Sequence, residues 1–540
     1  MAALLRRPCT LAASVSLLLV AGCAELAERK PPLDASIHAK LVPVLVVGAP
    51  TKRFPNGDRR EPEGAAYVFG QPLVQRLVIE GEQPKWLFPM QRLRSRVLEN
   101  SRSGDQFGRT SVLADFDGDG TNELIVAVPG AGHPQGQRPG LLNVLRFENG
   151  AFRQDQLLTK GFGRQLGLPG FLGDAIQVAD FTGDGHLDLI TSSPGHPIDD
   201  VAGRGALYLF RRQPDAQVAA SQRLFPPSPF EITASALEGF EGVSGLGTAM
   251  AVGDFDNDGR PDLAAVAPRH NPDGDTSSGV LIEFRGTGGA PGLTELRAHD
   301  EIPFARPGDD RRAHALVAGR LDDDEFDDLA VGIPAAGAGV PGAPDPPGGL
   351  VIFRGGPDGL SFSHSLATGG FQGLGNGDKF GMSLTAGDFD GDGRIDLAVG
   401  APLATSALFG GIELPPDSPF VGRPGAEAPP AVRVSTGRVY VYRGTPDGFR
   451  PWRALGHGDE RQIGQEFGTA LHAADMNGDG KTDLVVGAPG RTASPTSIVR
   501  SGGVLVYAGG IGGFTLVQTL TQAGLDDAED SDEFGLRLNN

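Results

Sequence analysis

Five short acidic segments of the sequence share one spacing of oxygen-bearing side chains. In residues 388–396, DFDGDGRID, acids occupy positions one, three, five and nine. This alternation lets the carboxylates converge while the residues between them point away, and Gly393 permits the tight bend. Hard oxygen ligands at flexible geometry suit Ca²⁺. The spacing therefore predicts a cation site in a loop.

The other four segments keep an oxygen side chain at each of these positions, and the carbonyl at position seven can add a further oxygen. The predicted side-chain ligands are Asp115, Asp117, Asp119 and Glu123; Asp180, Thr182, Asp184 and Asp188; Asp254, Asp256, Asp258 and Asp262; Asp388, Asp390, Asp392 and Asp396; and Asp475, Asn477, Asp479 and Asp483. The position-seven residues are Thr121, His186, Arg260, Arg394 and Lys481. One such loop alone could be a solvated Asp-Gly turn. Five in the same register favour about five bound Ca²⁺ ions.

Two regions depart from this pattern. In a sixth, weaker copy, Arg320 replaces the first acid, and we expect its positive charge to take the place of the metal. The repeat pattern at the two ends of the chain places a seventh loop at residues 36–44. These residues contain no carboxylate, so no Ca²⁺ is expected there.

Strands must position these loops, because each loop belongs to a longer repeated unit. A small apolar segment follows a glycine, then come the acidic loop, an apolar run ending in Gly-Ala-Pro or similar, and a further apolar run. The repeat glycine precedes the first acid by seven residues in five units, at Gly108, Gly173, Gly247, Gly381 and Gly468. Short apolar runs bounded by Gly, Pro and Asp are strand signals. Four strands per unit, the fourth more variable, fit a propeller blade.

The two ends of the sequence carry complementary parts of one unit. Residues 44–50 and 64–69 read as second and third strands with no first strand, whereas 534–538 (FGLRL) read as a first strand alone. Gly535 follows Gly468 by one repeat length. We therefore expect the C-terminal strand to complete the N-terminal blade, which makes seven blades in a closed ring. A linear β-solenoid would not explain the matching halves.

The FG…DxDxDG…GAP unit resembles the FG-GAP repeat of the integrin α-subunit propeller and the related VCBS repeats. The resemblance covers residues from about 36 to 540. It implies an all-β, seven-bladed β-propeller with Ca²⁺ in hairpins at the blade edges. It does not by itself imply integrin-like adhesion.

The N-terminus reads as an export signal. Residues 1–22 contain Arg6 and Arg7, a short apolar run and small residues, which is the pattern of a secretory signal peptide. The sequence Val-Ala-Gly-Cys ending at Cys23 resembles a bacterial lipoprotein box, in which the cysteine is lipidated; an ordinary signal peptide is the alternative. Residues 23–35 read as a tether and 36–540 as the propeller. We expect an exported protein, anchored by lipid to the bacterial cell envelope.

Composition and motifs narrow the function. A net charge of −20 makes nucleic acid a poor partner. No βαβ pattern flanks the glycine-rich stretch 373–377, so no nucleotide is expected, and no catalytic motif or catalytic residue is identified. We expect a module that binds a protein or glycan, with long insertions such as 403–436 on the face opposite the acidic loops. The alternatives are a polysaccharide hydrolase or lyase, and a structural subunit of a surface assembly.

Overall fold

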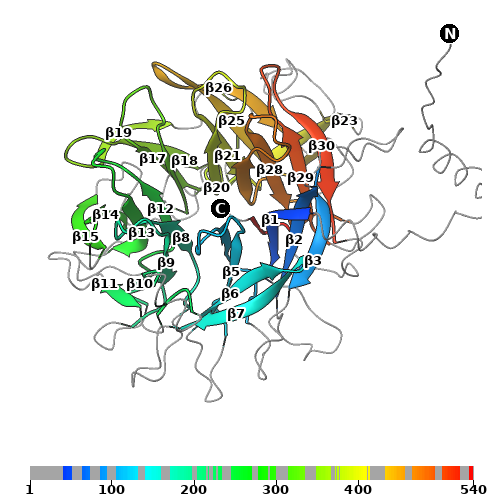
Figure 1. The fold of residues 1–540 in the computed structure, drawn as a ribbon. Helices are drawn as coiled ribbons and strands as arrows, with labels where there is room; N and C mark the ends of the chain where they lie inside the picture. The colour runs from blue at the N-terminus through cyan, green and yellow to red at the C-terminus, as the bar shows by residue number, and fades with distance from the viewer. Residues whose placement is uncertain are drawn as a thin grey trace, which may run out of the picture.

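The chain folds as a ring of β-sheets around a central axis (Figure 1). The computed structural model describes residues 41–50, 64–72, 86–93, 105–131, 140–159, 171–197, 203–213, 217, 223–226, 229–233, 245–270, 278–289, 292–299, 314–334, 348–366, 371, 374–375, 377–409, 412–413, 432–456, 465–492, 501–522 and 534–538. The predicted signal peptide (1–22), Cys23 and the tether (23–35) lie outside these residues.

Seven four-stranded antiparallel sheets form the blades, which confirms the predicted seven-bladed β-propeller. In the order of pairing they are β31 (Arg537–Leu538), β1 (Leu41–Ala49), β2 (Ala65–Pro72) and β3 (Phe88–Leu93); β4 (Ser111–Ala114), β5 (Glu123–Val128), β6 (Leu141–Glu148) and β7 (Ala151–Leu158); β8 (Ile176–Ala179), β9 (Asp188–Ser193), β10 (Ala206–Phe210) and β11 (Phe230–Thr233); β12 (Ala249–Gly253), β13 (Asp262–His270), β14 (Ser278–Gly286) and β15 (Leu293–His299); β16 (Ala315–Gly319), β17 (Asp328–Ile333), β18 (Gly349–Arg354) and β19 (Ser361–Leu366); β20 (Ser383–Gly387), β21 (Asp396–Ala401), β25 (Arg438–Thr445) and β26 (Gly448–Leu455); and β27 (Leu471–Ala474), β28 (Asp483–Ala488), β29 (Gly503–Ala508) and β30 (Thr515–Leu520).

The second strand of each blade forms the core of the ring. Strands β5, β9, β17, β21 and β28 are buried at every residue. Such a strand needs apolar residues on both faces, which explains the continuous runs of Leu, Val and Ala after each acidic loop. Strand β7, the fourth of its blade, alternates instead between buried and exposed residues. Hydrophobic clusters join neighbouring blades, so the ring is packed as one body.

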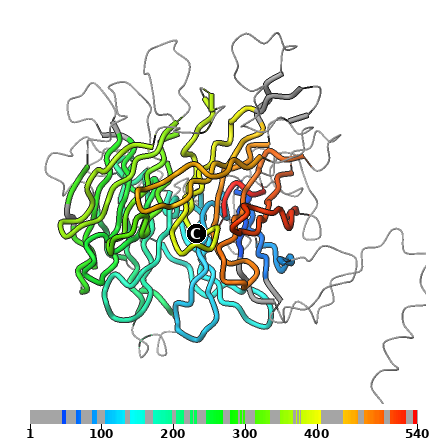
Figure 2. The backbone as a smooth tube through the Cα atoms, turned by 90° about the horizontal axis from the view of Figure 1, so that it is seen from above, coloured from blue at the N-terminus to red at the C-terminus, as the bar shows by residue number. Residues whose placement is uncertain are grey.

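The composite blade joins the two ends of the described chain. Strand β31 pairs with β1 through Val47 with Leu538 and Gly48 with Arg537. The Phe534 ring is fully buried, and its centroid lies 5.1 Å from that of Tyr67 in an edge-to-face arrangement. The blue N-terminal and red C-terminal segments are accordingly adjacent in two perpendicular views (Figures 1 and 2). The prediction that the C-terminal strand completes the N-terminal blade is confirmed.

Short parallel bridges connect the blades to one another. The phenylalanine of a Phe-Gly pair pairs with the glycine that precedes the third strand of the blade before it, as Phe467 does with Gly437 and Phe380 with Gly348. The repeat glycine then donates its N–H to the second strand of its own blade, as Gly468 does to the Gly487 carbonyl at 3.0 Å. The Phe-Gly pair therefore links two blades through main-chain contacts.

The longest insertion contains a small sheet where the sequence suggested only a loop. Strands β22 (Thr405–Phe409), β23 (Ile412–Glu413) and β24 (Val432–Ser435) form three antiparallel strands. The Ala404 carbonyl accepts the N–H groups of Thr436 at 3.2 Å and Gly437 at 3.1 Å, which brings the two ends of the insertion together. Within the described part of the chain, no helix has the length and apolar character required to cross a bilayer.

Candidate functional site

Each acidic loop connects the first and second strands of its blade. The position-nine acid is the first residue of the second strand in six blades, at Glu123, Asp188, Asp262, Asp328, Asp396 and Asp483. The remaining positions lie between the strands, as the sequence predicted for a strand–loop–strand arrangement. The six whole blades therefore carry these loops on the same edge of the ring.

The first acid of the loop organises the turn. Asp388 accepts N–H groups from Gly391 at 2.7 Å, Asp392 at 3.0 Å and Gly393 at 2.9 Å. Gly391 and Gly393 have φ of 79° and 88°, a region that favours glycine. Similar main-chain bonds are accepted by Asp115, Asp180, Asp254 and Asp475.

The last acid of the loop is buried and tied to the main chain on both sides. Asp396 accepts the Phe389 N–H at 3.1 Å and the Gly444 N–H, beside the third strand's end, at 2.9 Å. Burial is the main cause that raises the pKa of these position-nine acids. The pKa rises to about 7 for Glu123, Asp262 and Asp328, and to about 6 for Asp188, Asp396 and Asp483. A buried carboxylate of this kind is stabilised in its charged form by a nearby cation.

Carboxylates from positions one, three and nine converge in three of the five predicted sites. One oxygen of each acid lies within 4.8 Å of the others in the groups Asp115, Asp117 and Glu123; Asp254, Asp256 and Asp262; and Asp388, Asp390 and Asp396. Among the described residues the other two loops form no such group of three acids, because Thr182 and Asn477 supply neutral oxygens at position three.

Among the described residues, position five is the acidic ligand position that is not part of these convergent groups. Its acid turns toward the loop and accepts the N–H of position seven, as Asp392 does from Arg394 at 2.9 Å and Asp258 from Arg260 at 2.9 Å. The same bond is made to Asp119, Asp184 and Asp479 by Thr121, His186 and Lys481. Use of the position-seven carbonyls as ligands stays a prediction. The donor set as a whole consists of hard oxygens in a glycine-containing turn, and it fits Ca²⁺.

The sixth loop folds in nearly the same way despite its altered sequence. Asp322, Asp324 and Asp328 also bring oxygens within 4.8 Å of one another. The guanidinium beside them is that of Arg354, whose Nε lies 3.1 Å from Asp322 Oδ2. Among the residues described, Arg320, which we expect to supply the positive charge, makes no ion pair with these acids. Absence of metal at this loop, and at residues 36–44, stays a prediction.

The ring axis holds polar residues that sequence reasoning did not single out. A cavity of about 160 Å³ is lined by residues in or just before the first strands of the blades, which include Arg109, Asp174, His314 and Arg537. Arg109 Nη2 lies 3.3 Å from Asp174 Oδ1. Burial, followed by the charges of Arg537 and Arg109, lowers the pKa of His314 to about 4, so its imidazole is neutral at pH 7. Their position in the repeat could have identified two of these residues, because Arg109 and Asp174 each directly follow a repeat glycine.

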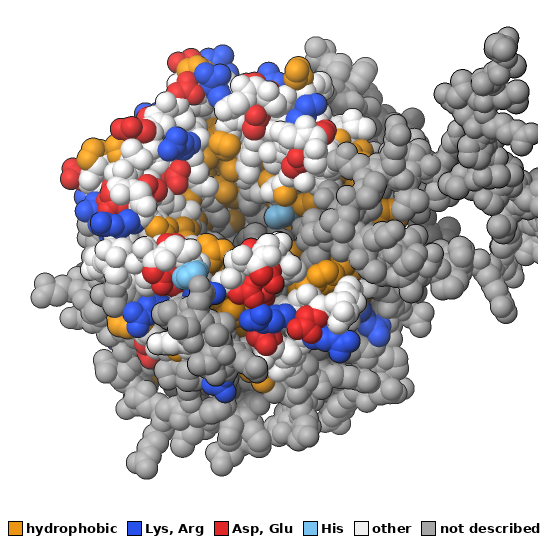
Figure 3. All heavy atoms as spheres, viewed as in Figure 1, with side chains coloured by type: hydrophobic (Ala, Val, Ile, Leu, Met, Phe, Trp, Pro, Cys, Tyr) orange, Lys and Arg blue, Asp and Glu red, His pale blue; other side chains and the backbone are white. Residues whose placement is uncertain are grey.

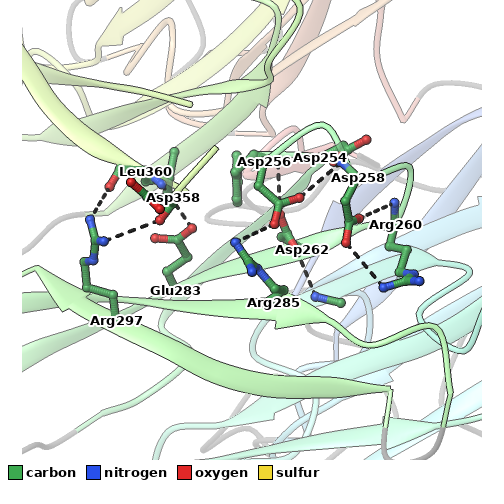
Figure 4. Close-up of polar contacts among 12 residues, drawn as sticks. Asp254, Asp256, Asp258, Arg260, Asp262, Glu283, Arg285, Arg297, Asp358 and Leu360 are labelled. Carbon is green, nitrogen blue, oxygen red and sulfur yellow. Dashed lines mark hydrogen bonds and ion pairs between the residues drawn. The ribbon is translucent and has the colours of Figure 1, made fainter. Parts of the chain in front are cut away.

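The acidic and basic side chains are mixed on the ring face seen in Figure 3. In the close-up of the third acidic loop, Asp254, Asp256 and Asp262 lie close together, with Arg285 reaching Asp256 from the third strand (Figure 4). A basic side chain therefore lies directly against the acids of this loop, although the whole chain carries a net charge of −20.

Comparison with known proteins finds the same repeat. The FG-GAP repeat family matches residues 246–282, 380–411 and 467–507, and the FG-GAP-like repeat family matches 111–191. The chain is 29% identical to human phosphatidylinositol-glycan-specific phospholipase D over 327 residues, which cover 59% of this chain and 35% of that protein.

Integrin α subunits are also similar. Identity is 31% over 310 residues with integrin alpha-PS2 of Drosophila melanogaster (53% of this chain, 20% of the integrin). It is 29% over 212 residues with integrin alpha-3 of Mus musculus (39% and 18%). The matched regions thus span about a third of the phospholipase and about a fifth of the integrins.

A solved structure, the periplasmic gluconolactonase PpgL of Pseudomonas aeruginosa, aligns with 91% of this chain and 97% of its own at 13% identity and a TM-score of 0.45. The strand topology, the register of the acidic loops and the two repeat-family matches agree with one another. The chain is a seven-bladed β-propeller in which residues 111–191, 246–282, 380–411 and 467–507 match FG-GAP or FG-GAP-like repeats, with sequence similarity to integrin α subunits.

Proposed function

We propose that this chain is an exported, lipid-anchored, calcium-binding β-propeller that binds a protein or glycan partner at the bacterial cell envelope. The observation that carries the proposal is the division of the ring into two edges. One edge holds five acidic loops of matching geometry. At the other edge the second strands end and the third strands begin, and the segments that connect them differ in length and sequence. Loops that keep the same ligand spacing in five blades suit a structural cation. Connections that differ from blade to blade suit recognition of a partner.

The calcium part of the proposal rests on the loops themselves. Three of them bring three carboxylates within 4.8 Å of one another. In the other two, the hydroxyl oxygen of Thr182 or the side-chain amide oxygen of Asn477 replaces the acid at position three. Two carboxylates about 5 Å apart repel by about 3 kcal/mol at an effective dielectric constant of about 20. A divalent cation relieves this repulsion. Extracellular Ca²⁺ modules bind at roughly 10⁻⁴ to 10⁻³ M, which sets the affinity expected here.

Equilibrium dialysis of the purified full chain with ⁴⁵Ca²⁺ tests this part directly. We expect about five bound ions per chain at millimolar Ca²⁺. The paired substitutions D388N and D390N in one loop should remove one of them. A stoichiometry near zero for the wild-type chain would refute calcium binding.

The recognition part rests on the insertion between β21 and β25. Its two ends meet at Ala404, so the insertion can be removed without separating the strands that flank it. Residues of β21 and β25 also pair directly, from Leu397 with Tyr442 to Ala401 with Arg438. The insertion is therefore an appendage of a blade that is complete without it.

Deletion of residues 405–433 tests recognition. We expect the variant to keep the thermal midpoint of the wild-type chain and to lose partners that the wild type retains from envelope extracts in a Ca²⁺-dependent manner. A variant that unfolds would refute the structural assignment. A variant that folds and retains the same partners would refute this face as the binding face.

Anchoring is proposed from the Val-Ala-Gly-Cys sequence and is tested separately. The C23S variant should move from the membrane fraction to the soluble exported fraction, while retaining the calcium stoichiometry of the wild type. Retention of C23S in the membrane fraction would contradict lipidation at Cys23.

The axial cavity favours a second candidate function, an enzyme that acts on a polysaccharide. It brings an acid, Asp174, and a neutral imidazole, His314, to one lined space. Release of new sugar ends from acidic polysaccharides, lost in H314A, would support this candidate. No release by the wild-type chain would leave the binding function as the conclusion.

A further inference from the structure

Arginines at one register position contact the acidic loops from a strand that is distant in sequence. The second residue of the second strand pairs with a third-strand residue, and the next third-strand residue is an arginine in four blades. The pairs that define this position are Leu124 with Leu145, Leu263 with Phe284, Leu329 with Phe353, and Leu397 with Tyr442. The arginines that follow are Arg146, Arg285, Arg354 and Arg443.

Each of these four guanidinium groups contacts the acid at loop position three. The N···O distances are 2.8 Å for Arg146 with Asp117, 2.6 Å for Arg285 with Asp256, 3.1 Å for Arg354 with Asp322, and 2.6 Å for Arg443 with Asp390. Figure 4 shows the pair at Asp256, where Arg285 approaches from β14. In every case the arginine contacts Oδ2 of the acid. The other oxygen, Oδ1, accepts the position-five N–H, as in Asp390 with Asp392 at 3.0 Å.

The two loops with a neutral residue at position three do not have this contact. Asn477 lies in a blade whose corresponding third-strand residue is Ala508, which follows Tyr507, the partner of Leu484. In the blade of Thr182 the corresponding residue is Arg211, whose side chain is exposed. Within the described residues, the arginine contact therefore occurs where position three is an acid and not where it is neutral.

The consequence is a common charge. At a site with four acids, the four ligand positions and the contacting arginine together have a formal charge of −3, as at Asp115, Asp254 and Asp388. The ligand positions of a loop with three acids and a neutral third position also carry −3, as at Asp180 and Asp475. This count leaves out the basic residues at position seven, which are Arg260, Arg394 and Lys481. At the site of Asp115 the arginine also contacts an acid outside the loop: Arg146 Nε lies 3.1 Å from Asp155 Oδ2.

We propose that the third-strand arginine offsets the charge of the acid at position three, which leaves −3 at the ligand positions of those sites, and thereby limits their Ca²⁺ affinity while keeping the metal-free loop folded. The inference rests on the calcium binding proposed above. Like charges in one loop raise its affinity for a divalent cation and at the same time destabilise the loop without the cation. A guanidinium held beside position three opposes both effects. In the sixth loop, the three acids at the ligand positions and the contacting Arg354 have a formal charge of only −2, and Arg320 stands in place of the first acid, which agrees with the prediction that this loop binds no Ca²⁺.

One test uses a tryptophan already placed beside a pair. The Trp452 ring lies 4.7 Å from Arg443 Cζ, so Trp452 is close to the Asp390 loop. The chain has two tryptophans, so in a W86F background Trp452 is the donor for Tb³⁺ luminescence when excitation is at wavelengths that tyrosine does not absorb. Displacement of Tb³⁺ by Ca²⁺ then reports the affinity of this loop. We expect R443Q to bind Ca²⁺ about five- to tenfold more tightly and R443K, which keeps the charge, to stay near the parent.

A second test moves the pair to a blade that lacks it and includes a readout without metal. In chelator, N477D should lower the thermal midpoint, and N477D/A508R should restore it. With Ca²⁺ added, N477D should gain the larger stabilisation of the two. If R443Q and R443K shift the Ca²⁺ affinity equally, or if A508R fails to reverse N477D, the charge-setting role is wrong.

These outcomes are separable from failure of the calcium proposal. A W86F parent with no Tb³⁺ luminescence and no stabilisation by Ca²⁺ would overturn calcium binding itself. A parent that binds Ca²⁺, together with an R443Q variant of unchanged affinity, would overturn only the role of the arginines.

Discussion

Gly400, near the end of one blade's second strand, lies directly against the main chain of Gly468 at the start of the next blade. A Cβ placed on Gly400 would overlap the Gly468 carbonyl oxygen. The same relationship joins Gly332 to Gly381 and Gly487 to Gly535. The glycine of Gly-Ala-Pro and the glycine of Phe-Gly are thus the two halves of one contact between neighbouring blades.

This contact predicts a cost for the smallest possible substitution. G400A should lower the free energy of unfolding by about 1–3 kcal/mol or more, because main-chain atoms of two blades must move apart. Gly400 has no positive φ, so the effect measures space and not backbone strain. The control is G289A, since no atom lies within 4 Å of a Cβ at Gly289. Urea unfolding of both variants checks the prediction, and equal stability of the two would contradict it.

Removal of Ca²⁺ should destabilise the whole ring. For sites with Kd of roughly 10⁻⁴ to 10⁻³ M, millimolar Ca²⁺ stabilises by about 0.4–1.4 kcal/mol per site, or about 2–7 kcal/mol for five sites. Differential scanning calorimetry with EGTA and then with excess Ca²⁺ should show a reversible drop in the thermal midpoint. Mg²⁺ at the same concentration should restore little, because it demands a smaller and more regular coordination shell. A midpoint indifferent to EGTA would count against the sites.

The buried position-nine acids predict an unusual pH dependence of the metal-free protein. Their pKa in the folded chain is raised to about 6 or 7, from ordinary values of 3.8 for Asp and 4.5 for Glu. The folded state therefore holds protons that the unfolded state releases, so this contribution is complete below the ordinary pKa and is lost as the pH rises through about 7.

In EGTA, the thermal midpoint should consequently fall between about pH 5 and about pH 7.5. Saturating Ca²⁺ should flatten the profile at the upper end, because the cation favours the charged acids. Thermal melts at constant ionic strength, with and without Ca²⁺, make the comparison. If the thermal midpoint of the metal-free protein rises over this pH range, these acids do not dominate the pH dependence of its stability.

Closure of the ring predicts a large effect of one aromatic residue. F534A removes a fully buried ring that contacts Tyr67 and Phe69 across the composite blade. We expect a loss of about 3–5 kcal/mol in the free energy of unfolding, as for other buried phenylalanines. F362A is a matched control, since Phe362 is 47% exposed on β19. Similar losses for both variants would argue against a special role for the closing contact.

The repeated units made most of the fold predictable. The fixed distance from Gly468 to Asp475, and its recurrence in five units, gave the blades, and the single repeat length from Gly468 to Gly535 gave the closing strand. The acid positions were likewise visible, because one turn places them. Phe-Gly and Gly-Ala-Pro were recognisable as motifs, yet their mutual contact depends on how two blades stack.

Other parts of the site depend on strand register and were missed. Arg443 follows Asp390 by 53 residues across a long insertion, and only the pairing of β21 with β25 brings them to 2.6 Å. The Arg-Gly pair at the end of the third strand, as in Arg285-Gly286, was a signal that repeats and could have been used. At the sixth loop, the sequence predicts that Arg320, which replaces the first acid, supplies the positive charge in place of metal, whereas the guanidinium in contact with Asp322 is that of Arg354.

The pairing of β31 with β1 also has a consequence for biosynthesis. The two strands come from opposite ends of the described chain, so one sheet remains a strand short until almost all of the sequence has emerged from the ribosome. Non-local pairings of this kind form late, after loop-closure entropy has been overcome. The other six sheets use strands that are near in sequence and can assemble first. The ring therefore closes only when β31 pairs with β1. Until then the nascent chain is an open arc in which one edge of β1 is unpaired.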